Sequence, residues 1–265
     1  MTPAFCCLLD ESRLPVLKAL LAEDGGDVLS SSIPRSTFVT LAKRADIDVG
    51  DDDIANLMDP LPLPWAAIHL GNFDAFALLT ERLKASDDLF FGLLHLAALL
   101  ALPRFVAKLL ETHDPNDKEE EFDHWIPLAM ACQARDLPWN IIANAEDDFR
   151  TRQKETMTLL AGKTDCAWRH RGRTVLHIAL ESGLETTRAL VEALDVRADP
   201  ARHTKYNYVD RAGRSYSPAE YVAEFVGTTD AEKAPLMDCL RSAKLLRSTW
   251  AALVAEGHLA GASRA

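Results

Sequence analysis

The chain has 265 residues, of which 48% are hydrophobic, so it can bury the core of one elongated domain or of two compact ones. Its 40 Asp and Glu residues against 29 Lys and Arg residues give a net charge of −11, which repels phosphate backbones and anionic membranes. We therefore expect neither nucleic acid nor a membrane as a partner.

The cysteines and the apolar segments point to an intracellular protein, in the cytoplasm or the nucleus. The five cysteines are odd in number and show no CxxC spacing, which favours reduced thiols over a disulfide framework. The first residues lack the basic region of a signal peptide. The longest apolar run, 89–103, is shorter than a membrane span.

Residues 1–60 are predicted to form a helical N-terminal cap that contains a degenerate half repeat. Leu14-Pro15 stands before an apolar helix at 16–21. Further helices are expected at 34–44 and at 51–58, where three aspartates favour a helix N-terminus.

One pattern recurs from residue 61 onward: a tight turn, a short helix with small residues, a break, and a leucine-rich second helix. The clearest copy begins at Thr174, and other copies begin at 62, 92, 126 and 217. The third copy carries an insertion between its two helices, from Asp136 to about Lys154. The turn glycine of the pattern is replaced in three copies, by Ala101, Arg135 and Val226.

This pattern resembles the ankyrin repeat, whose motif T-P-L-H-x-A-A-x-x-G is matched at Thr174, Leu176, His177, Ala179 and Gly183. The acid-rich third copy and its insertion resemble ankyrin proteins of filamentous fungi. The resemblance implies an all-α solenoid of five recognisable repeats at 61–229 with short β-hairpin fingers, followed by a capping helix and tail at 230–265. It also implies that His95 and His177 hydrogen-bond to the adjoining turn.

Three sequences that are similar to catalytic or metal-binding motifs are incomplete. Gly162-Lys163-Thr164 lacks the second glycine of a phosphate-binding loop, because Met157 stands in its place, and we expect Gly162 to end a helix. The acidic run 46–57 lacks the glycine and glutamate of a calcium loop, and the histidines lack metal-ligand spacing. We therefore predict no catalytic residue, no cofactor and no metal.

The three predicted fingers differ in charge. Residues 114–125 hold six acids, residues 163–173 hold four basic side chains with Trp168, and residues 206–216 hold three tyrosines. The opposite charges could pair across adjacent fingers as solvated loops, or the fingers could form a recognition rim. The tyrosines fit an interface and a half-buried loop anchor equally well.

Under the second interpretation, the partner-binding candidates are those fingers and the ends of the first helices. In the fingers they are Glu119, Glu120, Asp123, Trp125, Trp168, Arg169, Arg171, Tyr208 and Arg211. In the first helices they are Gln133, Arg135, Glu181 and Ser182.

The resemblance implies a protein–protein interaction module or scaffold, which we expect to be a monomer that binds a partner protein. One alternative is an enzyme or an enzyme regulatory subunit with a small-molecule pocket near 136–165, where Asp147, Asp148 and His124 could converge. Another is a fragment of a larger multidomain ankyrin protein.

Overall fold

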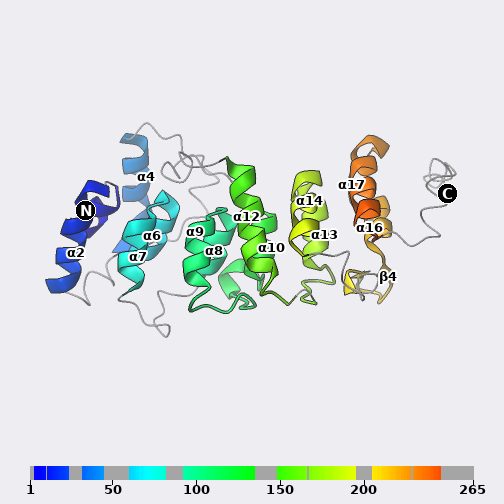
Figure 1. The fold of residues 1–265 in the computed structure, drawn as a ribbon, viewed down its shortest axis with the longest axis horizontal. Helices are drawn as coiled ribbons and strands as arrows, with labels where there is room; N and C mark the ends of the chain where they lie inside the picture. Colours follow the sequence, from blue (N-terminus) through cyan, green and yellow to red (C-terminus); the bar gives the residue numbers. More distant parts are fainter. Residues whose placement is uncertain are drawn as a thin grey trace. The chain divides into compact units, whose positions relative to one another are not determined.

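The computed structural model describes residues 3–9, 11–23, 32–44, 60–81, 92–134, 148–165, 167–194, 205–227 and 229–245 (Figure 1). The fold is mostly helical, with two short two-stranded sheets among these residues, so the all-α prediction is confirmed. The chain divides into two compact units, Met1–Leu159 (unit 1) and Leu160–Ala265 (unit 2). The expected helix at 51–58, Arg135 and the segment after residue 245 lie outside the described residues.

In the described part of unit 1 the chain forms short helices and one strand pair. Its elements are α1 (Pro3–Leu8), η1 (Glu11–Arg13), α2 (Leu14–Glu23), β1 (Ser32–Ile33), α4 (Arg35–Arg44), β2 (Leu61–Pro62), α6 (Leu63–Leu70), α7 (Phe73–Thr80), α8 (Leu93–Leu99), α9 (Pro103–Leu109), η3 (Glu120–Phe122), α10 (Pro127–Cys132) and α12 (Phe149–Ala161). The unit boundary falls inside α12.

The described residues of unit 2 form two helix pairs and a hairpin. Its elements are α13 (Val175–Ser182), α14 (Leu184–Ala193), β3 (Tyr208–Val209), β4 (Ser215–Tyr216), α16 (Pro218–Phe225) and α17 (Asp230–Ser242). The first helix of each of the five predicted copies, α6, α8, α10, α13 and α16, begins one residue after the start that the pattern gave.

Helix pairs stack on one another within unit 1. The pair α1 and α2 packs against α6 and α7, which pack against α8 and α9, and α8 packs against α10. The segment predicted as a degenerate half repeat holds two helices, α1 and α2, which pack together. Phe5 and Leu8 of α1 and Leu17 of α2 are fully buried. Buried Asn72 joins two pairs, since its side chain accepts from the Ala75 N–H at the start of α7 and donates to the Leu8 carbonyl.

The insertion in the third copy is shorter than predicted, because α12 begins at Phe149 and not near Lys154. The Asp148 carboxylate accepts hydrogen bonds from the backbone N–H groups of Arg150 and Thr151, which starts the helix there. Gln153 donates to the Ala131 carbonyl and so fixes α12 to α10. As predicted, the helix ends before Gly162, although this glycine is not left-handed.

In unit 2, α13 packs against α16, and α14 packs against α17. The helix predicted to close the chain from residue 230 is therefore the second helix of the last pair, since α17 packs against both α16 and α14. Capping boxes begin α16 at Ser217 with Glu220 and α17 at Thr229 with Glu232.

The predicted hairpin fingers differ from one another. In residues 206–216, β3 and β4 pair antiparallel, with Tyr208 opposite Tyr216, so a hairpin is present. Residues 163–173 form only an isolated bridge between His170 and Arg173. Residues 114–125 contain the 3-10 turn η3, followed by left-handed Asp123 and His124, in place of a hairpin.

Candidate functional site

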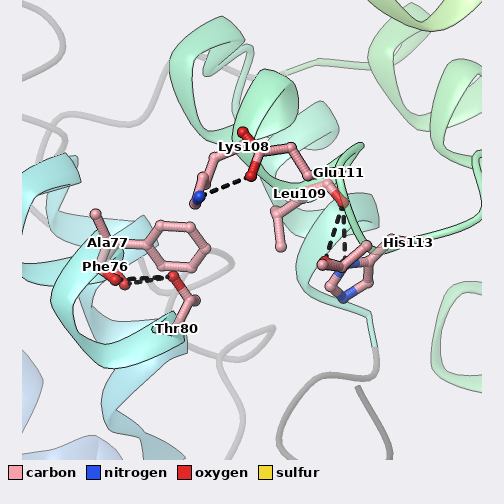
Figure 2. Close-up of polar contacts among 8 residues, drawn as sticks. Phe76, Ala77, Thr80, Lys108, Leu109, Glu111 and His113 are labelled. Atoms are coloured by element: carbon pink, nitrogen blue, oxygen red, sulfur yellow. Dashed lines mark hydrogen bonds and ion pairs between the residues drawn. The ribbon is translucent and has the colours of Figure 1, made fainter. Parts of the chain in front are cut away.

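The chain that enters the acidic finger, residues 114–125, is fixed at the end of α9 in unit 1. Figure 2 shows His113 beside Leu109, and its Nδ1 lies 3.1 Å from the Leu109 carbonyl oxygen. That oxygen only accepts, so this contact is a hydrogen bond in the tautomer that carries its proton on Nδ1. Lys108 and Glu111 pair at 2.7 Å on the same helix end, while Thr80 bonds back to the Phe76 and Ala77 carbonyls of α7 (Figure 2).

An aromatic stack holds the other end of the acidic finger. The Phe122 ring lies nearly parallel to Trp65, with 6.2 Å between centroids, and to His95, with 5.1 Å. His95 Nε2 lies 2.8 Å from the Trp125 carbonyl oxygen and 3.1 Å from the Asp117 carbonyl oxygen, so it donates to the finger backbone. The predicted bond from the imidazole to the adjoining turn is confirmed at His95.

This anchoring leaves acidic side chains at the surface. Glu120 and Asp123 are exposed, whereas Glu119 and Trp125 are half-buried. Partial burial and the neighbouring Asp114 charge raise the pKa of Asp117. Gln133 is exposed at the end of α10. The acidic candidates that the structure describes therefore lie on one loop, and His95 of α8 holds the backbone of that loop.

The basic finger, residues 163–173, differs from its prediction in where Trp168 lies. The residue is only 6% exposed, and its ring stacks on His170 with 6.2 Å between centroids. A tryptophan buried in this way anchors the finger itself and offers almost no area to a partner. Sequence reasoning expected an exposed anchor because the apolar character of a loop residue does not tell which side of the loop it occupies.

Arg169 is exposed, but its guanidinium connects the two fingers of unit 2. It donates to the backbone carbonyls of Lys205 at 3.1 Å, Gly172 at 3.3 Å and Asn207. The Val209 N–H donates to the Gly172 carbonyl at 3.2 Å. The basic finger and the tyrosine finger, residues 206–216, therefore form one continuous structure.

The two predicted residues at the end of α13 also make internal bonds. Glu181 accepts from Arg173 at 2.8 Å and from the Tyr221 hydroxyl, so it ties the basic finger to α16. Burial and the Glu181 carboxylate raise the pKa of Tyr221. Ser182 is exposed, and its hydroxyl donates back to the Ile178 carbonyl. Glu181 is thus a brace within unit 2.

Aromatic rings gather where the tyrosine finger meets α16. Phe225 lies edge-to-face against Tyr208 and Tyr216, with centroid distances of 5.4 and 5.3 Å, and 5.1 Å from Tyr221. Phe225 is nevertheless 51% exposed, while Tyr208 and Tyr216 are half-buried. An exposed phenylalanine held on three sides by tyrosines is a rigid apolar contact area.

One arginine lies against these rings, and two others are exposed in the turns of the same fingers. Arg211 is exposed in the turn of the hairpin, and Arg171 is exposed in the turn of the basic finger. Arg214 pairs with Asp210 at 2.7 Å, keeps 73% of its side chain exposed, and lies 5.7 Å over the Tyr216 ring. We call the set Arg171, Tyr208, Arg211, Arg214, Tyr216 and Phe225 the finger surface of unit 2.

His177 supports the finger surface from below. The Thr174 N–H donates to its Nδ1 at 3.1 Å, so the proton is on Nε2. Nε2 has no hydrogen-bond partner among the described residues, and the ring lies edge-to-face against Tyr221, with 4.4 Å between centroids. Burial lowers the pKa of His177 to about 3. The expected bond from this imidazole to the adjoining turn is therefore not formed, because aromatic rings occupy that position.

Comparisons of the chain with models of protein families, with curated proteins and with solved structures found no match. Among the described helices, none combines the length and the apolar character that crossing a bilayer requires. Within the same residues, no three His, Cys, Asp or Glu side chains are grouped so that they could hold a metal ion.

Of the three residues named for the alternative small-molecule site near 136–165, two lie in the described part of the chain, Asp148 and His124, and both are exposed. Asp147 lies outside the described residues, while hydrogen bonds from Thr151 and the Arg150 backbone lower the pKa of exposed Asp148, as suits a helix cap. A groove of about 670 Å³ lies elsewhere, between α14 and α17, and is lined by Leu184, Val191 and Cys239. Burial raises the pKa of the Cys239 thiol, which makes it a poor nucleophile.

Sequence reasoning missed Phe225, Tyr216 and Arg214. A signal for Phe225 was present, because it occupies the same place in the fifth copy as Ser182 in the fourth, eight residues after the helix N-cap. Tyr216 and Arg214 lie within the tyrosine finger, but their contact depends on the hairpin register.

Proposed function

We propose that the chain is a protein-binding module, built as a divergent ankyrin-repeat solenoid, and that the finger surface of unit 2 holds a partner protein. The observation that carries the proposal is Phe225, a half-exposed aromatic ring fixed between Tyr208 and Tyr216. Aromatic and arginine side chains contribute most to the binding energy of protein interfaces. The rigid setting means that little side-chain entropy is lost on binding.

Local features support the ankyrin part of the proposal. Five first helices begin within one residue of the positions given by the motif, left-handed Gly71 ends one of them, and Gly183, with φ of 105°, ends another. Ala101 adopts the same left-handed conformation in the second copy, with φ of 53°. In the last copy the left-handed position moves from Val226 to Gly227. His95 supplies the bond from helix to finger that the resemblance implies.

The test is affinity capture with the full chain from a lysate of its source organism. Phe225→Ser is compared with Val16→Ser, because Val16 is equally exposed at 52% but lies on α2 in unit 1. We expect a protein that is retained by wild type and by Val16→Ser and is lost with Phe225→Ser. Thermal melts must show that both variants fold. A protein retained equally by all three chains would refute this surface as the binding site.

A further inference from the structure

The end of α16 exposes a carboxylate and an aromatic ring on neighbouring residues. Glu224 and Phe225 are the last two residues of the helix, and both are exposed. Glu224 forms no hydrogen bond or ion pair with any residue that the structure describes. Partial burial raises the pKa of Tyr216, and the Glu224 charge adds to this shift. The unpaired carboxylate is therefore close to the Tyr216 ring, which Phe225 contacts at 5.3 Å.

Arg214 shows how a cation is held on these rings. Its guanidinium lies 5.7 Å over the Tyr216 ring and pairs with Asp210 at 2.7 Å, so a ring and a carboxylate bind it together. Phe225 and Glu224 present the same two groups. In the described part of the chain, however, no cation lies over the Phe225 ring.

Three other cations of unit 2 are held by groups outside the ring cluster. Arg173 pairs with Glu181 at 2.8 Å. Arg169 donates to backbone carbonyls of the fingers. Lys233 donates to the Ala223 carbonyl at 2.6 Å. The exposed pair of residues at the end of α16 is therefore open to a cation from a partner, and the partial negative charge of a helix C-terminus favours one there.

The fingers limit the charge that a partner can bring. Arg171 and Arg211 are exposed in the turns of the two fingers of unit 2. A segment with several cations would place like charges against them, which lowers the affinity for such a partner. A single cation at the unpaired carboxylate meets an opposite charge instead.

We propose, on the basis of the function above, that the partner contributes a segment with a single arginine among uncharged residues, and that this arginine binds at Glu224 and Phe225. Its guanidinium would donate two hydrogen bonds to the carboxylate. Its flat face would lie on the Phe225 ring, as Arg214 lies over Tyr216. Lysine is a point charge without this planar fork, so arginine should be preferred.

Other classes of ligand fit less well. An acidic segment would bring carboxylates next to Glu224. A purely apolar segment would remove water from the Glu224 carboxylate without replacing its hydrogen bonds. RNA could stack bases on Phe225, but the chain's net charge of −11 opposes a phosphate chain that extends beyond the fingers.

The experiment is selection of short random peptides on the immobilised full chain, followed by affinity measurements for the enriched peptides at two salt concentrations. We expect enriched peptides to share one arginine with uncharged neighbours. Replacing that arginine by lysine should weaken binding by about threefold, and replacing it by glutamine should weaken binding by more than about tenfold.

Three variants of the chain locate the site. Phe225→Ser should weaken the peptides by more than about tenfold. Phe225→Leu keeps an apolar side chain but removes the ring, and should weaken them by about threefold. Glu224→Gln should weaken them by about fivefold and reduce the salt dependence of binding. Because Glu224 is exposed and unpaired, this variant tests the site without loss of folding.

Glu185→Gln is the matched control, because Glu185 is 59% exposed on α14 of the same unit and its substitution removes the same charge. It should bind the peptides as wild type does. Peptides that depend on Phe225 but contain no arginine, or that Glu224→Gln leaves unaffected, would overturn the arginine assignment and leave the proposed binding surface intact. Peptides unaffected by Phe225→Ser would overturn both proposals. A selection that enriches no peptide would overturn the arginine assignment alone, since affinity capture tests the surface with whole proteins.

Discussion

His95 in unit 1 and His177 in unit 2 occupy the same place in the recurring sequence pattern, but different fingers cover them. Over His95 the acidic finger brings two backbone carbonyls, which accept from Nε2. Over His177 lie the rings of Tyr208 from the tyrosine finger and of Tyr221 from α16, and Nε2 has no acceptor among the described residues. The helix position is retained while the finger chemistry changes, so the helices supply the framework and the fingers supply the surface.

The exposed side chains differ in the same way. Above His95 the finger exposes carboxylates and uses Phe122 as an internal anchor between Trp65 and His95. Above His177 the aromatic cluster extends outward and leaves Phe225 half in solvent. The aromatic ring of Phe122 therefore stabilises unit 1, whereas the ring of Phe225 in unit 2 is available for contact with a partner.

The largest effect is expected from alanine at Gly172 of the basic finger. A Cβ on Gly172, with φ of 82°, would lie 1.8 Å from the Val209 backbone oxygen, so the two fingers of unit 2 must separate. We expect Gly172→Ala to destabilise unit 2 by more than about 3 kcal/mol, since left-handed strain adds to a lost hydrogen bond and a backbone clash. Amide hydrogen exchange in α13 measures it.

Gly92→Ala is the matched variant in unit 1. Its φ is 70°, and the added Cβ would lie 2.8 Å from Cε2 of Phe122 and 3.1 Å from the Trp65 ring, which are side-chain atoms and not backbone. We expect a loss of about 1 to 2 kcal/mol from strain, seen as exchange in α8. Equal losses for both variants would show that the fingers are not fixed differently in the two units.

The second-largest effect is a loss of folding stability at acid pH, caused by two buried histidines. Burial lowers the pKa of His177 to about 3 and that of His69, in unit 1, to about 4. The folded chain keeps both neutral below pH 6.5, where the unfolded chain binds protons, so stability falls as pH drops from 6.5 toward 4. Each histidine therefore lowers the free energy of unfolding by about 2 kcal/mol at pH 5 relative to pH 7.

Chemical denaturation at pH 7 and pH 5 tests this difference. His177→Gln should remove about 2 kcal/mol of the acid-induced loss, and His69→Gln should remove a similar amount independently. The readout is the difference between the two pH values, so a general loss of stability in either variant does not affect it. An unchanged difference in His177→Gln would mean that Nε2 finds an acceptor or water in the folded protein.

The starts of the helices could be predicted from the sequence, whereas the exposed residues of the fingers could be predicted only in part. Local signals such as Thr174, Pro127 and Ser217 at helix starts depend on neighbouring residues, so the five first helices were found to within one residue. The burial of Trp168 and the exposure of Phe225 depend on how loops fold onto helices, which involves residues distant in sequence. The role of Glu181 as a brace likewise requires Tyr221, forty residues away.

The smallest expected effect comes from Glu181→Gln, which tests whether Glu181 is only an internal brace or also contacts a partner. Glu181→Gln removes the ion pair with Arg173, whose side chain is 24% exposed, and keeps an acceptor for Tyr221, so we expect a loss of about 1 kcal/mol in the denaturation of unit 2. Glu185→Gln, which breaks an exposed pair with Arg188, should cost less than about 0.5 kcal/mol. If Glu181 acts only as a brace, Glu181→Gln will leave the affinity for Phe225-dependent peptides unchanged. If those peptides bind more weakly while stability stays at its wild-type value, the Glu181 charge faces the ligand, and the finger surface extends onto α13.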